Sequence, residues 1–221
     1  MLYLVATPIG NFEDLSPRAQ RILGEAETIL VEKKSDSIKL FARFGIKPKR
    51  IIPYDENNHN RTIKGILSLL EKEDVAMITS AGMPGVSDPG ARLIKEVKNA
   101  GIAFRVVPGP SALPVVIAAG GFPGPYLFVG FLPKKSAQIN SFFERKKTSE
   151  ETIVFFESGI RILKTLEILA QDTGWNVSIS KEISKIHETH LQDKAAELLE
   201  VFKKAPSLQK GEFACLTRYE R

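Results

Sequence analysis

Cysteine is almost absent from this sequence. Cys215 is the single cysteine among 221 residues, so no disulfide can form within the chain. A composition of this kind fits a reducing compartment. The first residues, MLYLVATPIGN, lack the basic region of a secretory signal peptide and reach proline too early for one. We therefore expect a soluble, cytoplasmic protein.

A strong net charge is also missing. The chain has 31 Lys and Arg against 26 Asp and Glu, a net charge of +5, which permits a polyanionic partner without requiring one. The excess lies in two segments: Lys33 to Arg50 has seven basic residues and one acid, and Lys134 to Lys147 has five basic residues and one acid. Charge runs are commonly solvated helix faces. The alternative is a pair of surfaces that contact RNA phosphates.

No membrane-spanning segment is expected, although residues 106–133 carry no charge. This stretch contains six prolines and five glycines, which a continuous helix does not tolerate.

Apolar strands alternate with amphipathic helices along the chain, which predicts two α/β domains, at residues 1–112 and 113–221. The first is expected to be a parallel sheet with helices on both faces, and the second a mixed sheet, with a cleft between the domains. The strands are predicted at 2–6, 28–31, 50–53, 75–79, 103–107, 126–131, 152–157, 176–182, 187–191 and 212–218. The helices are predicted at 17–23, 37–44, 58–71, 88–100, 112–119, 137–147, 161–171 and 194–203.

Three loops rich in glycine and proline follow strands of the first domain, at Thr7–Asn11, Ser80–Gly90 and Pro108–Ala112. Ligands of parallel α/β sheets bind beyond the carboxyl ends of the strands. One such loop would be an ordinary turn, but three at one sheet edge favour a small-molecule site. The sequence has no P-loop motif and no Gly-x-Gly-x-x-Gly after its first strand, which disfavours a phosphate-rich nucleotide.

Several segments are specific enough to indicate a family. They occur in the order LYLVATPIGNFEDLSPRAQRIL, FGI, SAGMPGVSDPGARL, VVPGPSAL, AAGGFP, FVGFLPKK, FFES, KEISK and KGE. This order resembles the tetrapyrrole-methylase superfamily of S-adenosylmethionine (SAM) enzymes, and within it the branch that methylates ribosomal RNA.

The resemblance implies a SAM-dependent methyltransferase, usually a homodimer, that acts on the 2′-hydroxyl of a cytidine in small-subunit (16S) ribosomal RNA. No metal is implied. The implied SAM-binding residues are Pro8, Ile9, Gly82, Met83, Val86, Ser111, Ala112 and Phe156. A ribose hydroxyl must be deprotonated or polarised, and the candidates for this role are Glu157, Glu182 and Lys185. The candidates for RNA contact are Arg161, Lys33, Lys34, Lys134 and Lys135. Glu182 and Lys185 have an alternative interpretation as a surface ion pair.

The chain also departs from the ribosomal branch at three positions. Glu32-Lys33-Lys34-Ser35 stands where that branch typically has Glu-Asp-Thr-Arg, Ser80 where it has Asp, and Ile160 where it has His, so an acid, an arginine and a histidine are missing. Two alternatives therefore stay open: a methyltransferase acting on a tetrapyrrole ring, and a degenerate member that binds SAM or RNA without catalysis. His187 and His190 are interpreted as surface histidines rather than metal ligands, because residues three apart on a strand point to opposite faces.

Overall fold

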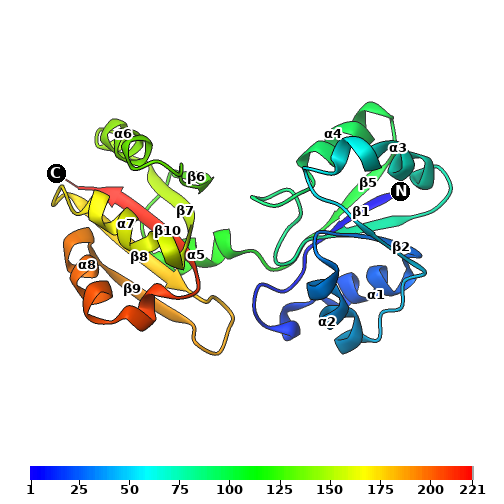
Figure 1. Cartoon of the computed structure of the whole chain (residues 1–221), viewed down its shortest axis with the longest axis horizontal. Helices are drawn as coiled ribbons and strands as arrows, with labels where there is room; N and C mark the ends of the chain where they lie inside the picture. The colour runs from blue at the N-terminus through cyan, green and yellow to red at the C-terminus, as the bar shows by residue number, and fades with distance from the viewer. Residues whose placement is uncertain (221) are drawn as a thin grey trace. The chain divides into compact units, whose positions relative to one another are not determined.

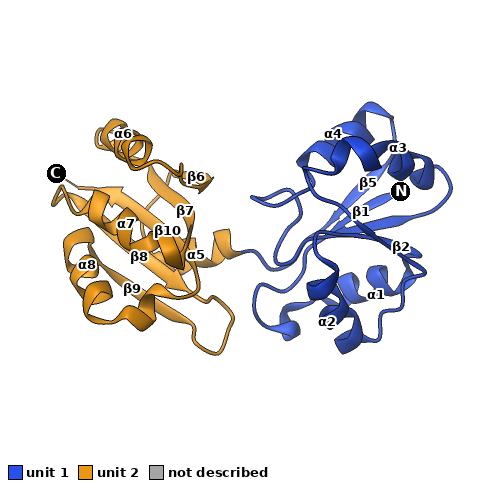
Figure 2. Ribbon diagram, in the orientation of Figure 1, with its two compact units in different colours: residues 1–111 blue, residues 112–221 orange. Residues whose placement is uncertain are grey.

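The structure is a computed structural model that describes residues 1–220. The chain forms two compact units, Met1–Ser111 and Ala112–Arg221, here called unit 1 and unit 2 (Figure 2).

Unit 1 is built on a five-stranded sheet in which every strand pair is parallel, in the order β3-β2-β4-β1-β5. Strands β1, β2 and β5 of this sheet are labelled in Figure 1. The central strands β2 and β4 are buried along their whole length, as expected for strands covered on both faces. The strands are β1 (Leu2–Val5), β2 (Thr28–Val31), β3 (Arg50–Pro53), β4 (Val75–Ile78) and β5 (Phe104–Val107).

Helices cover both faces of this sheet, each with its own core. On one face, α1 (Pro17–Glu25) and α2 (Lys34–Phe44) bury Ile22, Leu23 and Phe41. On the other face, α3 (His59–Leu70) and α4 (Ala91–Asn99) bury Ile66 and Leu93. The predicted fold class of unit 1 is confirmed.

Unit 2 has a five-stranded mixed sheet in the order β6-β7-β10-β8-β9. Only β6 and β7 pair in parallel, and the other pairs are antiparallel. Its strands are β6 (Tyr126–Phe131), β7 (Thr152–Ser158), β8 (Trp175–Lys181), β9 (Thr189–Lys194) and β10 (Glu212–Tyr219). The mixed sheet agrees with the prediction.

The main core of unit 2 lies under three helices, α6 (Ser136–Lys146), α7 (Gly159–Leu169) and α8 (Ala195–Lys204). Trp175 belongs to this core, where its ring makes edge contacts with Phe143 and Tyr219. The apolar helix α5 (Ala112–Gly120) contacts β8 and β10, and a methyl group at Gly120 would lie 2.8 Å from Leu216 Cδ1.

Some predicted boundaries were wrong by a few residues. Helix α4 begins at Ala91 rather than at Asp88, because the Gly85 N–H donates to Pro89 O at 3.0 Å and so keeps Pro89 in the preceding loop. Two short 3₁₀ helices, η1 (Phe12–Asp14) and η2 (Pro206–Gln209), were not predicted. None of the helices within residues 1–220 is both long and apolar enough to cross a bilayer.

Candidate active site

The three loops of unit 1 lie side by side because they follow the neighbouring strands β4, β1 and β5. The first two loops are joined by a pair of backbone hydrogen bonds, Thr7 N–H to Gly82 O at 2.9 Å and Gly82 N–H to Thr7 O at 3.0 Å. The Thr7 hydroxyl also donates to Thr79 O at 3.2 Å. The expected gathering of three loops at one sheet edge is therefore present.

Two glycines allow these loops to approach one another. Gly82 has φ +77°, a backbone conformation that side chains other than glycine seldom adopt. The position of its missing Cβ is 3.5 Å from Ile9 Cγ2 and 3.9 Å from Pro110 O, so all three loops meet there. At Gly109 a Cβ would lie 2.9 Å from Ala6 Cβ, which is too close without a shift of the backbone.

The Ser80–Gly90 loop has an unusual backbone. Besides three glycines with positive φ, it holds Ser87 at φ +61°. Strained residues of this kind persist where the surroundings fix them, and they gather at ligand sites. One fixing contact comes from Glu56, whose Oε1 accepts the Gly90 N–H at 3.1 Å.

The chemistry of these loops fits SAM and not a phosphorylated cofactor. Residues 7–11, 80–90 and 108–112 contain no lysine or arginine to balance a phosphate. They offer the apolar side chains of Ile9, Met83 and Val86 together with backbone donors and acceptors, a lining suited to an adenosine and an amino acid. Ser111 is the last residue of unit 1, and Ala112 begins α5.

One acid near the loops was not among the predicted site residues. Glu32 directly follows β2, and its Oε2 accepts the Ser80 N–H at 3.1 Å. An acid placed immediately after a buried strand next to β4 is the signal that could have identified it. Glu32 therefore fixes the start of the second loop from the neighbouring strand.

The basic segment that begins at Lys33 starts at the same edge of the sheet. Lys33 and Lys34 are exposed, with Lys33 at the N-cap of α2. Farther along, Lys49 pairs with Glu27, and Arg50 pairs with Glu73 at 3.0 Å. Within residues 1–220 the five other basic side chains of the segment form no ion pair: Lys33, Lys34, Lys39, Arg43 and Lys47.

In unit 2, the predicted residues gather where β7 and β8 end and β10 begins. Ser158 pairs with Glu212, and Lys181 pairs with Phe213, so these strand ends are neighbours. Phe156, the predicted SAM contact of this unit, makes edge contacts with Phe128 at 5.1 Å and Phe131 at 5.9 Å between ring centroids.

Glu157 is buried and fully engaged. Its Oε2 accepts from the Thr165 hydroxyl at 2.9 Å, and its Oε1 lies 3.4 Å from Arg161 Nε. Arg161 in turn donates to the carbonyl oxygens of Leu132 and Pro133 at 3.1 and 2.6 Å. This network ties α7 to the segment after β6, so both predicted side chains hold the shape of this edge.

Glu182 and Lys185 form an ion pair at 3.2 Å, as in the alternative interpretation given above. Lys185 also lies 2.8 Å from Glu212 Oε2, and Glu182 Oε1 accepts the Glu212 N–H at 2.8 Å. Burial opposes ionisation of both groups. These hydrogen bonds and charges outweigh it, so the pKa of Glu182 is lowered and the pKa of Lys185 is raised. Both side chains are therefore charged at neutral pH.

In the second basic segment, Lys134 to Lys147, some basic side chains form ion pairs and others do not. Lys134 and Lys135 are exposed and precede α6. At the other end of α6, Lys146 pairs with Glu151 at 2.7 Å. Lys147 is hydrogen-bonded by Glu144 and Asp172, which raises its pKa above the usual 10.5. Within residues 1–220, Lys134, Lys135 and Arg145 form no ion pair, and Arg145 donates to Ser141 Oγ at 2.9 Å.

His187 lies in the turn before β9 rather than on a strand, and His190 lies within β9. His190 Nδ1 lies 2.8 Å from Ser180 Oγ, and its Nε2 lies 2.7 Å from Glu188 Oε1. Among residues 1–220, no group of three His, Cys, Asp or Glu side chains is arranged to hold a metal ion.

The chain belongs to the tetrapyrrole methylase family, and its two α/β units agree with that assignment. The family described as Tetrapyrrole (Corrin/Porphyrin) Methylases matches residues 1–199. Methyltransferases of this family use SAM as the methyl donor.

Curated relatives carry a more specific name. A protein of Thermotoga maritima named "Ribosomal RNA small subunit methyltransferase I" is 40% identical over 210 residues, which cover 94% of each chain. A protein of the same name from Coprothermobacter proteolyticus is 40% identical over 85% of this chain and 86% of its own length.

Solved structures share the fold at low sequence identity. The methyltransferase CobJ has a TM-score of 0.71 at 17% identity, covering 99% of this chain and 93% of its own. Diphthine synthase has a TM-score of 0.74 at 14% identity, covering 97% of this chain and 88% of its own.

Proposed function

We propose that this chain transfers a methyl group from SAM to the 2′-hydroxyl of a cytidine in small-subunit ribosomal RNA. The observation that carries the proposal is the three-loop edge of unit 1, which has no lysine or arginine, in a chain 40% identical over 94% of its length to a relative named as a ribosomal RNA methyltransferase. The proposed holders of SAM are the loop residues named above, together with Phe156.

SAM, when bound, supplies a methyl group on a positively charged sulfur. With SAM held by the loop residues named above, the transfer would join that methyl group to the ribose oxygen and leave the sulfur uncharged, with the hydroxyl proton released to solvent. Such a reaction depends largely on positioning, and the fixed backbone of the Ser80–Gly90 loop supplies it on the SAM side.

On the RNA side, we assign Lys185 to polarise the hydroxyl. Its side chain is about one-third exposed and its ammonium group stays protonated beside Glu182, so it favours the negative charge that develops on the ribose oxygen. The lowered pKa of Glu182 makes it a weak base, so we do not assign it to remove the proton. Its role is to orient Lys185 through their ion pair. Glu157 is a positioning residue that acts through Arg161.

The charged surface supports an RNA substrate. Lys33, Lys34, Lys134 and Lys135 are exposed, and they are proposed to contact phosphates. We further propose a homodimer, and a cytoplasmic location because assembled small ribosomal subunits are found there.

The decisive experiment measures transfer of labelled methyl groups from SAM to small subunits that lack the modification. The product is expected to be a ribose linkage that resists alkaline cleavage. Lys185→Gln should lower the rate by roughly 10²-fold or more with unchanged calorimetric affinity for SAM, and Lys185→Arg should restore part of it. Lys164→Gln, an exposed change on α7, is the control.

Either of two other results would reject the proposed function in favour of an alternative. Methyl transfer to a porphyrinogen but not to RNA would support the tetrapyrrole alternative, which the family description also admits. Binding of SAM without transfer to any RNA would identify a non-catalytic member. This second alternative is motivated by Lys33, Ser80 and Ile160, the last of which is 96% exposed.

A further inference from the structure

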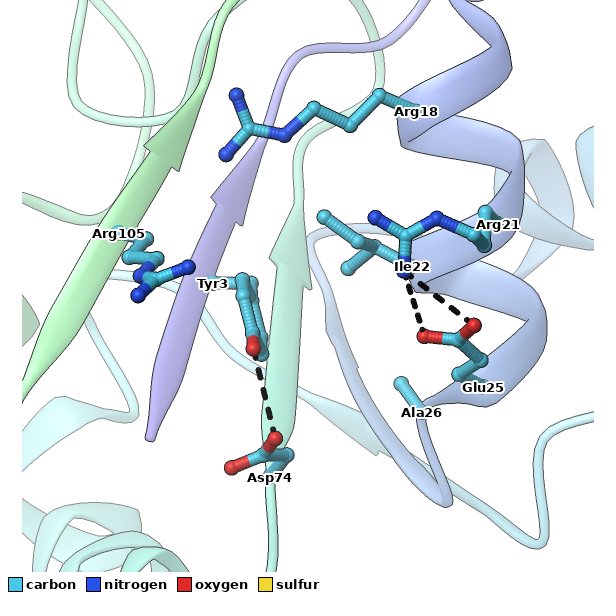
Figure 3. Close-up of a pocket in the computed structure, with 8 residues that line it drawn as sticks. All are labelled: Tyr3, Arg18, Arg21, Ile22, Glu25, Ala26, Asp74 and Arg105. Carbon is cyan, nitrogen blue, oxygen red and sulfur yellow. Dashed lines mark hydrogen bonds and ion pairs between the residues drawn. The ribbon is translucent and has the colours of Figure 1, made fainter.

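Unit 1 has a pocket of ≈ 380 Å³ between helix α1 and the strands β1 and β5 (Figure 3). Tyr3 and Arg105 are paired neighbours on β1 and β5, and Arg18 and Arg21 reach in from α1. Ile22 of the same helix completes the apolar part of the wall. A volume of this size suits a small ligand.

This pocket is separate from the SAM loops, which are the three loops of unit 1 at residues 7–11, 80–90 and 108–112 that are proposed to hold SAM. Tyr3 and Arg105 are each the second residue of their strands, whereas the loops begin beyond the last residues. Tyr3 precedes Thr7 by four residues, which places them about 13 Å apart along an extended strand. The pocket therefore lies toward the amino ends of strands whose carboxyl ends support the loops.

The charges in the pocket are unevenly compensated. Arg21 is held by Glu25 through two contacts, at 3.0 and 3.3 Å. At the rim, the Asp74 carboxylate pairs with the Met1 ammonium at 2.9 Å and accepts from the Tyr3 hydroxyl at 3.5 Å. Within residues 1–220, Arg18 and Arg105 have no ion pair, and both guanidinium groups point toward the space beside Tyr3 (Figure 3).

We propose that this pocket binds the phosphate of a nucleotide between Arg18 and Arg105, with the base or ribose against Tyr3 and Ile22. Planar guanidinium groups match phosphate oxygens in geometry as well as charge. An aromatic ring beside them offers a surface for a base. The three loops at the other end of the strands contain no lysine or arginine, so they offer a phosphate no such cationic partner.

The same chemistry is offered by a free nucleotide and by a nucleotide within RNA. If the nucleotide belongs to RNA, the pocket is a second place on unit 1 that contacts the RNA substrate, and the inference then rests on the proposed function. A free nucleotide would instead make the pocket an effector site.

The test measures binding of CMP, of cytidine and of a single-stranded RNA to the intact protein by calorimetry and fluorescence anisotropy. Arg18→Gln and Arg105→Gln remove one charge each from exposed side chains, so the fold is expected to survive. Each should weaken CMP binding roughly tenfold or more. Cytidine should bind poorly to every form. Glu25→Gln should strengthen CMP binding, because it frees Arg21 and removes a negative charge. Arg61→Gln, an exposed change on α3 at the other face of the sheet, is the matched control.

The outcomes separate the ligand sources and the two proposals. Weakening of both CMP and RNA binding identifies RNA as the source, and weakening of CMP binding alone identifies a free nucleotide. Unchanged CMP and RNA binding in both arginine variants would overturn the inference. Methyl transfer by the wild type is measured separately. If the wild type transfers no methyl group but binds CMP in a way that depends on Arg18 and Arg105, the proposed function is rejected and the proposed nucleotide pocket is supported.

Discussion

The contact between Gly109 and Ala6 allows a sharp test of the loop-built site. In Gly109→Ala the new methyl carbon would lie 2.9 Å from Ala6 Cβ, whereas ordinary contacts lie between 3.4 and 4 Å. Ala6 has no flexible side chain to move, so the backbone after β1 or β5 must shift by about half an ångström. Overpacking of this kind costs roughly 1–3 kcal/mol. A displacement of this order in a site that works by positioning is expected to weaken SAM binding by about tenfold or more.

Gly24→Ala is the matched control. Gly24 lies in α1, and no atom is found within 4 Å of its missing Cβ. Alanine in a helix interior is favoured over glycine by about 1 kcal/mol. The same chemical change is therefore expected to stabilise unit 1 at one glycine and destabilise it at the other, a difference of about 2–4 kcal/mol.

The assay is urea unfolding followed by far-ultraviolet circular dichroism, with calorimetric titration of SAM on the same samples. Dichroism is required because the single tryptophan, Trp175, lies in unit 2 and does not report on unit 1. If Gly109→Ala unfolds at the same urea concentration as the wild type and binds SAM equally well, the argument from loop packing is wrong.

Three further predictions concern unit 2. Arg161→Met leaves the buried carboxylate of Glu157 without its cationic partner, and the free energy of unfolding should fall by about 3–5 kcal/mol in urea titrations. Changing Lys134 and Lys135 to Gln together should weaken RNA binding and reduce the slope of log affinity against log salt by about 1.4, from two lost phosphate contacts on a single strand. The Gly174 N–H and Lys147 lower the pKa of Asp172, so its stabilising effect is present above the unfolded value of 3.8 and is lost as the pH falls through the lower folded value. Trp175 fluorescence should follow that loss of unit 2 in acid.

Each of these predictions has its own control. Glu157→Gln keeps the hydrogen bonds without the charge, so adding it to Arg161→Met should recover part of the lost stability. The exposed pair Lys203 and Lys204 on α8, changed in the same way, should leave the salt dependence of RNA binding as it was. Asp172→Asn should show a smaller loss of stability as the pH falls below 3.8, and an unchanged acid transition would contradict the assignment.

Several strands followed from short apolar runs, both at the buried centre of a sheet, as in β2, and at a sheet edge, as in β6. Residues 28–31 and 126–131 were predicted to the residue, since each run has a sharp polar or turn-forming boundary. The strand predicted at 187–191 was found at 189–194. It is an edge strand with mostly polar side chains, and its position depends on pairing with β8 rather than on a local pattern.

The site was predictable where it depends on strand order and not where it depends on tertiary partners. Glycine and proline after three strands were enough to expect loops at one edge. The contacts of Glu157 with Thr165 and Arg161 could not be predicted from the sequence. They depend on tertiary packing, since Arg161 is itself held by carbonyl groups that follow β6. No spacing within the FFES segment indicates that its glutamate is buried.

The strand order has a consequence for synthesis of the chain. In unit 1 the last strand to be made, β5, pairs at the sheet's edge, so the four other strands are already available when it emerges. In unit 2 the last strand, β10, pairs between β7 and β8, so this sheet stays divided until residues 212–219 leave the ribosome. The sheet of unit 1 can therefore be completed without unit 2, whereas the sheet of unit 2 keeps a gap between β7 and β8 until β10 has been made.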